Sequence, residues 1–280
     1  MSLGATLPDL GVGLGYRSQL HTRILEHTEE IDWLEILTDE YIHDAGARER
    51  LQPLREWFPL VPHGLEMSIG SQEPLDEDYV RAVAAVADAV DAPWVSDHLC
   101  FTRDHGIDLG SLTPVYRTVA HARRIAQKAQ RVQEMLGRPF LLENIAYYVD
   151  LPGELSEAEM LSEVMRHCDC GILLDLNNVA VNAANHGFDP YHFLDALPLE
   201  RVQQIHVAGN SPAQRQEGLQ FDAHDAEVSD EVLRLLAHLL VRQDVKGILL
   251  ERDGAFPADF SEIVADMRRV RDVAAREGLR

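Results

Sequence analysis

Acidic and imidazole side chains stand at the ends of short apolar segments spread over most of this 280-residue chain. Six successive segments carry such a residue, namely His63, His98, Glu143, Asp175, His206 and Glu251. The loop sequence FDAHD adds Asp222 and His224. Imidazole and carboxylate ligands together suit iron, manganese or zinc. Eight candidate ligands exceed the need of one ion, so the pattern predicts two or three ions that share a bridging carboxylate.

These side chains need a compensating charge if the fold gathers them in one place. A buried imidazole or carboxylate without a partner is costly to desolvate. Carboxylates held close together also repel one another and raise one another's pKa values. A bound cation removes both costs. A single member of the set could have a purely structural role, but the repetition across successive segments favours a shared metal centre.

The apolar segments themselves have the length and composition of β-strands. Most are nearly all apolar rather than alternating, which is typical of strands covered on both faces of a parallel sheet. The predicted strands are Gly11–Tyr16, Trp33–Leu37, Leu60–Leu65, Trp94–His98, Phe140–Glu143, Gly171–Asp175, Val202–Val207 and Gly247–Glu251.

Helical patterns separate these strands. Apolar residues spaced by three and four run from Val80 to Val90 and from Val119 to Leu136, and Ser156 and Ser229 are expected to cap two further helices. After Asp175 we expect no helix until about residue 189. Strand and helix alternation implies a parallel sheet. The prediction is a single domain over residues 1–280 with an α/β fold, a (β/α)8 barrel of the triosephosphate isomerase (TIM) type, and a doubly wound open sheet is the alternative.

The barrel prediction explains how distant residues meet. In such barrels the active site lies at the carboxyl ends of the strands and in the loops that follow them. The candidate ligands occupy those positions. Histidines on predicted helices are expected to pack or to face solvent instead, and we expect His121 on an exposed helix.

The amino-acid composition limits which binding partners the protein can have and indicates the cellular compartment in which it works. The chain has 25 Lys and Arg against 47 Asp and Glu, a net charge of −22, which argues against binding to nucleic acid or to anionic lipid. Three cysteines, Cys100, Cys168 and Cys170, do not form a disulfide framework and fit a reducing compartment. We find neither an apolar run of membrane-spanning length nor an export signal, and therefore predict a cytoplasmic protein.

A family resemblance rests on several ordered motifs between about Gly11 and Glu251. These are HGLEMSIGS, SDHLCFT, LLENIAYY, LLDLNNVAVNAANHGFDP, IHVAGN and FDAHDAEVSDEV. Together they resemble the multinuclear non-haem iron-dependent oxidative enzymes, which include enzymes of methanobactin and thiaglutamate biosynthesis. The resemblance implies a TIM-type barrel with two or three irons in mixed Fe(II)/Fe(III) states. It implies an O₂-dependent oxidation of a residue, usually cysteine, in a ribosomally synthesised precursor peptide, whose leader a separate partner protein often presents.

The resemblance also implies a distribution of ligands. The first iron would take His63, His98 and the bridging Glu143. The second would share Glu143 and take the remaining strand-end residues, Asp175, His206 and Glu251. A third, more labile iron would involve Asn178, Asp222 and His224.

Two positions depart from the pattern of many relatives. Those relatives have His-Ser-Glu-Asn after the second strand, where this chain has Thr38, Asp39 and Glu40, and a histidine where Asn210 stands. Both departures bear on the peptide class and the product rather than on the metal cage. The candidates for positioning the peptide are Glu35, Tyr147, Tyr148, Asn182 and His186.

Two other functions remain open from the residues alone. One is a metal-dependent TIM-barrel hydrolase or isomerase, either a divalent-metal sugar isomerase or a three-zinc phosphodiesterase, although the charge of −22 weighs against a nucleic acid substrate. The other is a non-catalytic, metal-loaded scaffold that binds a peptide or a partner enzyme.

Overall fold

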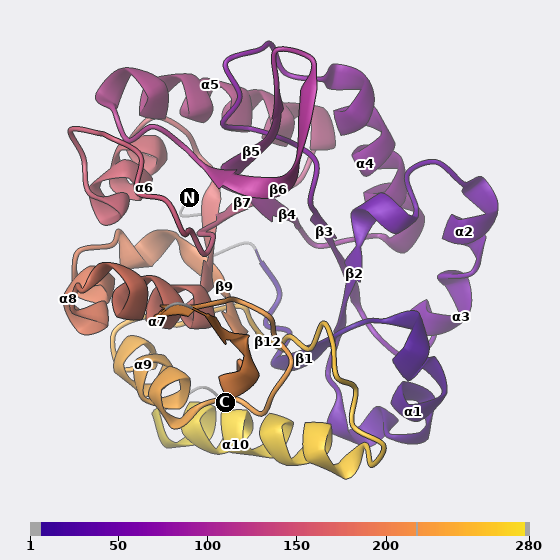
Figure 1. The fold of residues 1–280 in the computed structure, drawn as a ribbon. Coiled ribbons are helices and arrows are strands. Elements are labelled where there is room, and N and C mark those ends of the chain that lie inside the picture. The colour runs from indigo at the N-terminus through magenta and orange to yellow at the C-terminus, as the bar shows by residue number, and fades with distance from the viewer. Residues whose placement is uncertain (1–6, 217, 278–280) are drawn as a thin grey trace.

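A closed barrel of eight parallel strands forms the centre of the protein (Figure 1). The computed structural model describes residues 7–216 and 218–277. The barrel strands, in spatial order, are β1 (Val12–Gly15), β2 (Leu34–Leu37), β3 (Leu60–Gly64), β4 (Val95–His98), β7 (Phe140–Glu143), β8 (Gly171–Asp175), β9 (Val202–Val207) and β12 (Gly247–Leu250), which closes onto β1. The eight predicted strands and the barrel are thus confirmed, and the open sheet is wrong.

Helices surround this barrel (Figure 1). They are α1 (His21–Glu26), α2 (Ala45–Glu49), α3 (Gln52–Arg55), α4 (Glu77–Val90), α5 (Val119–Leu136), α6 (Glu157–Arg166), α7 (Leu176–His186), α8 (Pro190–Asp195), α9 (Asp230–Leu240) and α10 (Ser261–Glu277). Ser156 caps α6 and Ser229 caps α9, as predicted, and Ser156 forms a capping box with Glu159. No helix in the described part of the chain is long and apolar enough to cross a membrane.

The interior of the barrel divides into an apolar part and a polar part. A separate cluster of buried apolar residues consists of Trp33, Val61, Trp94, Leu141, Leu173 and Leu249. Trp33 and Trp94 directly precede β2 and β4, so this cluster fills the end where the strands start. The Trp94 indole donates a hydrogen bond to Gln204 at 2.6 Å, where the polar part begins. Side chains at the opposite end therefore lie next to a packed apolar layer.

Gly13 in β1 tests this packing. A Cβ atom added there would lie 2.5 Å from the Trp33 ring, closer than real Cβ contacts allow. Overpacking of a filled core costs about 1–3 kcal/mol, so we expect Gly13→Ala to lower the free energy of unfolding by that amount in urea denaturation. Gly254→Ala is the control, because a Cβ there meets nothing within 4 Å. Equal stability of the two variants would contradict this packing.

Two expectations about helices are wrong. Helix α7 begins directly after β8 rather than near residue 189, with Asp175 as its N-cap: the carboxylate accepts the backbone N–H of Asn178 at 2.6 Å. Its buried residues include Asn177, Asn178 and Asn182 beside Leu176 and Val179, so the apolar spacing is interrupted by polar residues. His121 is buried rather than exposed, and its Nε2 lies 2.8 Å from the Gly70 carbonyl oxygen.

The strand-to-helix connections also contain two small sheets that the sequence did not predict. Strands β5 (Cys100–Asp104) and β6 (Ile107–Pro114) form an antiparallel hairpin directly after β4. Strands β10 (Arg215–Gln216) and β11 (Leu219–Gln220) pair in the loop after β9. Both sheets follow barrel strands at their carboxyl ends, so they add walls to the face that carries the candidate ligands.

Candidate metal centre

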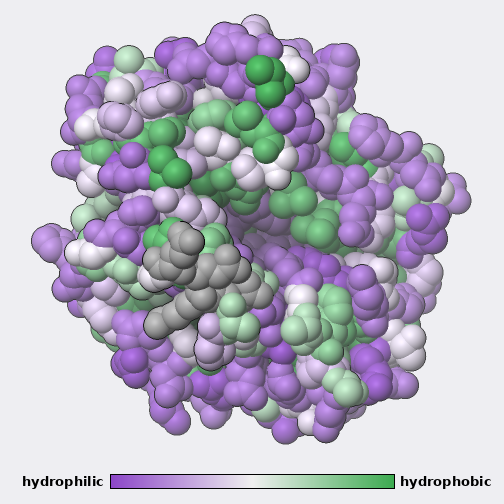
Figure 2. Space-filling model, viewed as in Figure 1, coloured by the Kyte–Doolittle hydropathy of each residue, from purple (hydrophilic) through white to green (hydrophobic). Residues whose placement is uncertain are grey.

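A cavity of about 580 Å³ opens at the carboxyl end of the barrel. Figure 2 shows that face hollowed near its centre, with hydrophilic residues inside the hollow. Seven of the nine residues proposed as ligands line the cavity, namely His63, His98, Glu143, Asn178, Asp222, His224 and Glu251. The other two, Asp175 and His206, lie beneath it with no exposed surface. The structure therefore brings the whole predicted set to one place.

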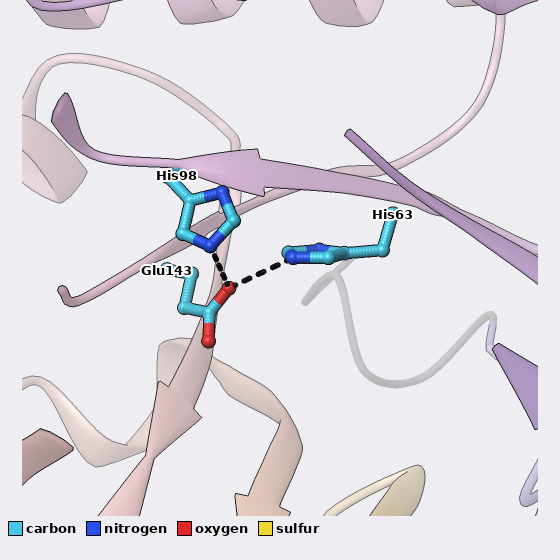
Figure 3. A group of neighbouring side chains, drawn as sticks. All are labelled: His63, His98 and Glu143. Atoms are coloured by element: carbon cyan, nitrogen blue, oxygen red, sulfur yellow. Dashed lines mark ion pairs between the residues drawn. The ribbon is translucent and has the colours of Figure 1, made fainter. Parts of the chain in front are cut away.

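The first group of side chains joins three strands (Figure 3). His63 at the end of β3 and His98 at the end of β4 both point toward Glu143 at the end of β7. Each histidine Nε2 lies 3.2 Å from the same oxygen, Glu143 Oε2. Two ligands at right angles on one ion with bonds of about 2.1 Å are about 3 Å apart, so the spacing fits a shared cation.

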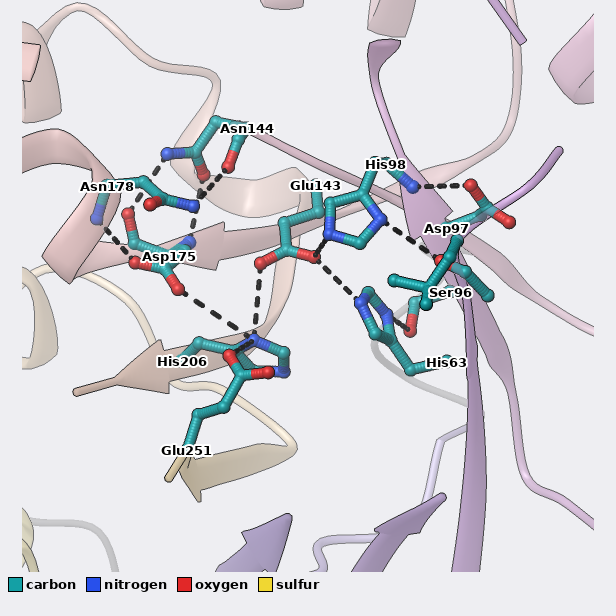
Figure 4. A network of polar contacts seen from close by, with 12 residues as sticks. His63, Ser96, Asp97, His98, Glu143, Asn144, Asp175, Asn178, His206 and Glu251 are labelled. Carbon is teal, nitrogen blue, oxygen red and sulfur yellow. Dashed lines mark hydrogen bonds and ion pairs between the residues drawn. The ribbon is translucent and has the colours of Figure 1, made fainter. Parts of the chain in front are cut away.

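The second group lies on the other side of Glu143 (Figure 4). His206 Nδ1 in β9 is 3.2 Å from Glu143 Oε1, 3.1 Å from Glu251 Oε2 and 3.9 Å from Asp175 Oδ2. One atom from each of these four residues lies within 4.8 Å of the others. Glu143 therefore presents one oxygen to each group, which is the geometry of a bridging carboxylate.

The outer nitrogen of each of these three histidines is already engaged. His63 Nδ1 lies 2.9 Å from Ser96 Oγ, and His98 Nδ1 lies 3.0 Å from the carbonyl oxygen of Gly64. His206 Nε2 contacts Glu35 Oε2 at 3.1 Å and the Gln204 side chain at 3.0 Å. Such partners orient imidazole ligands and set their tautomer. The free nitrogen of each ring points at Glu143.

His98 supplies the sharpest test of whether a cation fits. A carbonyl oxygen only accepts, so His98 Nδ1 must donate to Gly64. Burial lowers the pKa of His98, which keeps the ring neutral and leaves a lone pair on Nε2. That lone pair faces Glu143 Oε2, a buried atom with no hydrogen-bond partner in the described residues. Two acceptors at 3.2 Å repel unless a proton or a metal ion lies between them, so this contact fits either a protonated Glu143 or a bound metal ion.

The remaining pKa shifts describe a site with excess acidic charge. Burial raises the pKa of Glu143 to about 7 and raises that of Asp175 well above its usual range. Burial alone would lower the pKa of His206, but Glu35, Glu143 and Glu251 outweigh it and raise that pKa overall. Without a metal ion, protons are the cations available to this cluster, and metal binding would displace them.

His224 and its neighbours form the third part of the site. Its Nε2 lies 2.7 Å from Asp222 Oδ1, and its Nδ1 lies 3.2 Å from Glu251 Oε2 and 3.5 Å from Asp253 Oδ2. Asn178 Oδ1 is buried and without a hydrogen-bond partner in the described part of the chain. The structure thus places the three residues predicted for a third ion around the same cavity, and it adds Asp253.

Sequence reasoning missed most of the supporting residues. Ser96, Asp97 and Gln204 are buried polar residues next to the ligands, and Asp97 accepts the backbone N–H groups of His98 and Met67 at 2.7 and 3.2 Å. A signal existed for Asp253, because it stands two positions after Glu251 and so on the same side of an extended segment. The others had no signal, since single polar residues in apolar strands look structural.

The five residues proposed to position a peptide lie in different parts of the structure. Tyr148 alone lines the 580 Å³ cavity. Tyr147 and His186 stack on each other at 4.4 Å and line a neighbouring cavity of about 410 Å³. Asn182 is buried and binds the backbone of Tyr147 and Ile145. Glu35 is buried and supports His206.

Glu35 therefore gives a prediction about metal affinity. It holds His206 Nε2 and also accepts from Gln204 Nε2 at 2.6 Å, without reaching the centre itself. Loss of such an outer partner typically weakens metal binding about 10–100-fold. We expect Glu35→Gln to weaken binding at the His206 group by that factor in a competition titration with a chelator. An affinity within twofold of the unaltered protein would show that Glu35 does not orient the ring.

Asn210, where many relatives have a histidine, has a supporting role. Its Oδ1 accepts the backbone N–H groups of Ala223 and His224 at 2.8 and 3.1 Å. Its Nδ2 donates to Asn177 Oδ1 at 2.9 Å. Asn210 thus fixes the loop that carries His224 against helix α7.

Solved structures share the fold at low sequence identity. A D-tagatose 3-epimerase-like protein matches with a TM-score of 0.63 and 16% identity, covering 95% of this chain and 97% of that one. Endonuclease IV from Thermus thermophilus matches with a TM-score of 0.58 and 20% identity, covering 96% and 100%. These likenesses show the TIM-type barrel alone.

Sequence comparisons identify relatives and a family in addition to the fold. A UPF0276 protein of Anaeromyxobacter sp. is 38% identical over 268 residues, which cover 95% of this chain and 93% of the relative. A UPF0276 protein of Pseudomonas aeruginosa is 36% identical over 270 residues, covering 96% and 94%. The family model described as RiPP precursor modification enzyme MbnB/TglH/ChrH matches residues 11–275. The motifs that line the cavity lie inside that match, and the chain belongs to the MbnB/TglH/ChrH family of enzymes that modify the precursors of ribosomally synthesised peptides.

Proposed function

We propose that this enzyme is an O₂-dependent oxidase with two or three irons that modifies a cysteine of a ribosomally synthesised precursor peptide. The family supports a precursor peptide as the substrate. One observation carries the proposal of a multinuclear centre: Glu143 presents one carboxylate oxygen to the His63 and His98 group and the other to the His206 group. A shared carboxylate between two ligand groups is the arrangement expected of a pair of metal ions.

We assign the proposed ligands to three ions, of which the first two share Glu143. His63, His98 and Glu143 would hold the first ion. Glu143, Asp175, His206 and Glu251 would hold the second. Asn178, Asp222 and His224 would hold the third, as the family resemblance implies. When bound, iron supplies the redox chemistry with O₂ that no protein side chain of this site offers.

The protein's own residues would orient the peptide and exclude water. The cavity wall includes the apolar side chains Leu37, Leu65 and Leu112 around the charged floor. Tyr148 also lines it, and its hydroxyl accepts the backbone N–H of Asp222 at 3.0 Å, which holds the loop before His224. A cavity of about 580 Å³ has room for one side chain and the adjoining peptide backbone.

We propose further that a separate partner protein presents the peptide leader at this face, and that the chain acts as one domain in the cytoplasm. Exposed large apolar residues on the segments that follow β4 and β7 support a docking role: Ile107 and Leu109 lie on the β5–β6 hairpin, Tyr116 lies just beyond it, and Tyr148 and Val149 lie in the loop after β7. Clusters of exposed apolar residues commonly mark interaction sites. The three free cysteines are in keeping with a reducing compartment.

Co-expression with short cysteine-containing open reading frames encoded beside the gene tests the activity. The expected result is a coloured, iron-containing protein after aerobic purification, and a peptide whose mass changes only when O₂ is present. A His98→Ala variant is the inactive control. An unchanged peptide mass with all such peptides, despite bound iron, would favour a scaffold. A colourless protein saturated with zinc or magnesium would favour a sugar isomerase or phosphodiesterase.

A further inference from the structure

A second cavity, of about 410 Å³, lies beside the candidate metal centre. Residues at the start of α6, at the end of α7 and in α8 line it, on one side of the barrel (Figure 1). The segment Ala146–Tyr148 separates the two cavities, because Ala146 and Tyr148 line the 580 Å³ cavity whereas Tyr147 lines this one. A peptide with one side chain in the metal cavity can therefore cross this segment and place a second side chain in the other cavity.

Aromatic side chains form much of the wall of the second cavity. The rings of Tyr147 and His186 stack with centroids 4.4 Å apart and an interplanar angle of 17°. Phe188 and Phe193 also line the cavity, with ring centroids 5.7 Å apart. Such a wall packs well against the aliphatic stem of a long side chain whose polar end finds a partner elsewhere.

The main hydrogen-bond donors of this cavity are already engaged. Arg117 forms an ion pair with Asp150, and its Nε donates to the carbonyl oxygen of Leu155 at 3.1 Å. His186 Nε2 lies 2.9 Å from the carbonyl oxygen of Tyr147, which only accepts, so this nitrogen carries the proton. In the neutral ring Nδ1 is then an acceptor. A ligand that brings donors therefore suits the cavity better than an anion does.

Glu157, the first residue of α6, supplies a free acceptor. Its Oε2 is buried and has no hydrogen-bond partner in the described part of the chain. Burial raises the pKa of Glu157 to about 7, although Arg117 and the Tyr147 hydroxyl oppose this shift. Above that pH the group is mostly ionised, and a buried carboxylate oxygen without a partner is costly. A positively charged donor would remove this cost.

We infer that the second cavity binds a lysine or arginine side chain of the precursor peptide, with its charged end on Glu157 and its aliphatic stem against the aromatic wall. The inference rests on the proposed function for the identity of the substrate. The charges of the wall agree with it, because Asp150, Glu157 and Asp189 outnumber Arg117. The two sides of one backbone segment are about 10 Å apart and an extended peptide advances about 3.3 Å per residue, so the basic residue should stand about three positions from the modified cysteine.

Calorimetric titration of the purified protein with two matched probes tests this inference. The probes are Nα-acetyl-lysine methylamide and its uncharged analogue Nα-acetyl-norleucine methylamide, at about pH 8 and physiological salt. We expect the lysine probe to bind at least about tenfold more tightly than the norleucine probe, as a charged hydrogen bond allows. Glu157→Gln should abolish this preference. Glu163→Gln is the control and should keep it, because Glu163 is a buried carboxylate of the same helix that does not line the cavity.

A second variant tests the location of the probe. Ala196 lines the cavity from an exposed position, so Ala196→Leu should fill part of the cavity without disturbing the core and weaken both probes at least about fivefold, as loss of a packing contact allows. Equal affinity of the two probes, a preference that survives in Glu157→Gln, or unchanged binding in Ala196→Leu would each overturn the inference.

The outcomes also separate this inference from the proposed function. Probe binding needs neither iron nor O₂, so lysine-specific binding without oxidation of any precursor would count against the proposed function alone. A precursor that is oxidised although it has no Lys or Arg within about four positions of the modified cysteine would count against the second cavity alone.

Discussion

Glu143→Ala is expected to release both ions of the pair. Its two oxygens serve two different groups, at 3.2 Å from His63 and His98 and 3.2 Å from His206. Its loss therefore takes one ligand from each ion and leaves their charges facing each other. We expect the metal content, measured by mass spectrometry of the purified protein, to fall by more than one equivalent. Peptide oxidation should fall at least about a thousandfold, equivalent to about 4 kcal/mol.

The matched control is Glu163→Gln in α6. Glu163 is also buried, at 7% exposure, but its partners are His167, Arg166 and Arg123 on the outside of the barrel. Its replacement should leave the metal content unchanged. Loss of only one ion, or of none, in Glu143→Ala would show that the carboxylate does not bridge.

Metal removal is expected to destabilise the fold as a whole. Within the described residues, one buried carboxylate oxygen each of Glu143 and Asp175 has no hydrogen-bond partner. A ligand present at about a thousand times its dissociation constant stabilises the folded state by about 4 kcal/mol. Because 1 kcal/mol shifts the melting temperature of a protein of this size by about 2–4 °C, loss of two ions should lower it by at least about 10 °C.

Calorimetry of anaerobically chelated protein measures this change. Addition of Fe²⁺ should restore the melting temperature. Mg²⁺ should restore less, because it prefers oxygen ligands and the first group offers two imidazoles. A melting temperature unchanged within about 2 °C after complete metal removal would mean that the ligands are held by the barrel alone.

The clustering of the strand-end residues was predictable from the apolar runs that precede them. An apolar run in a barrel strand ends where the chain leaves the core, so a His or Glu at that position lies at the rim whichever loop follows. His63, His98 and Glu143 illustrate this, since each is the last or next-to-last residue of its strand. Closure of the eight strands into a barrel then brings these strand ends together around one cavity.

Residues that reach the site from other positions than these strand ends were not predictable in the same way. Arg17 and Glu35 reach the site through side-chain direction, which depends on the tilt and register of β1 and β2. Helix α7 was not predicted because asparagines interrupt the apolar residues on its buried side. His121 appeared to be a surface residue because its spacing does not show that its ring lies under Gly70. Tertiary packing decides such positions, and the spacing of residues along the chain does not encode it.

The N-cap of α7 has a consequence for how this site would evolve. Asp175 uses Oδ1 to start the helix and keeps Oδ2 turned toward His206 and His224. Because the N-terminus of α7 holds Oδ1, we expect the Asp175 carboxylate to keep its orientation toward the proposed metal site. Neighbouring loops are free to diverge with the peptide they receive, whereas any change at Asp175 would disturb a helix start as well as the chemistry. We therefore expect a substitution at Asp175 to disturb both the start of α7 and the proposed metal site, whereas a substitution in a neighbouring loop need not disturb either.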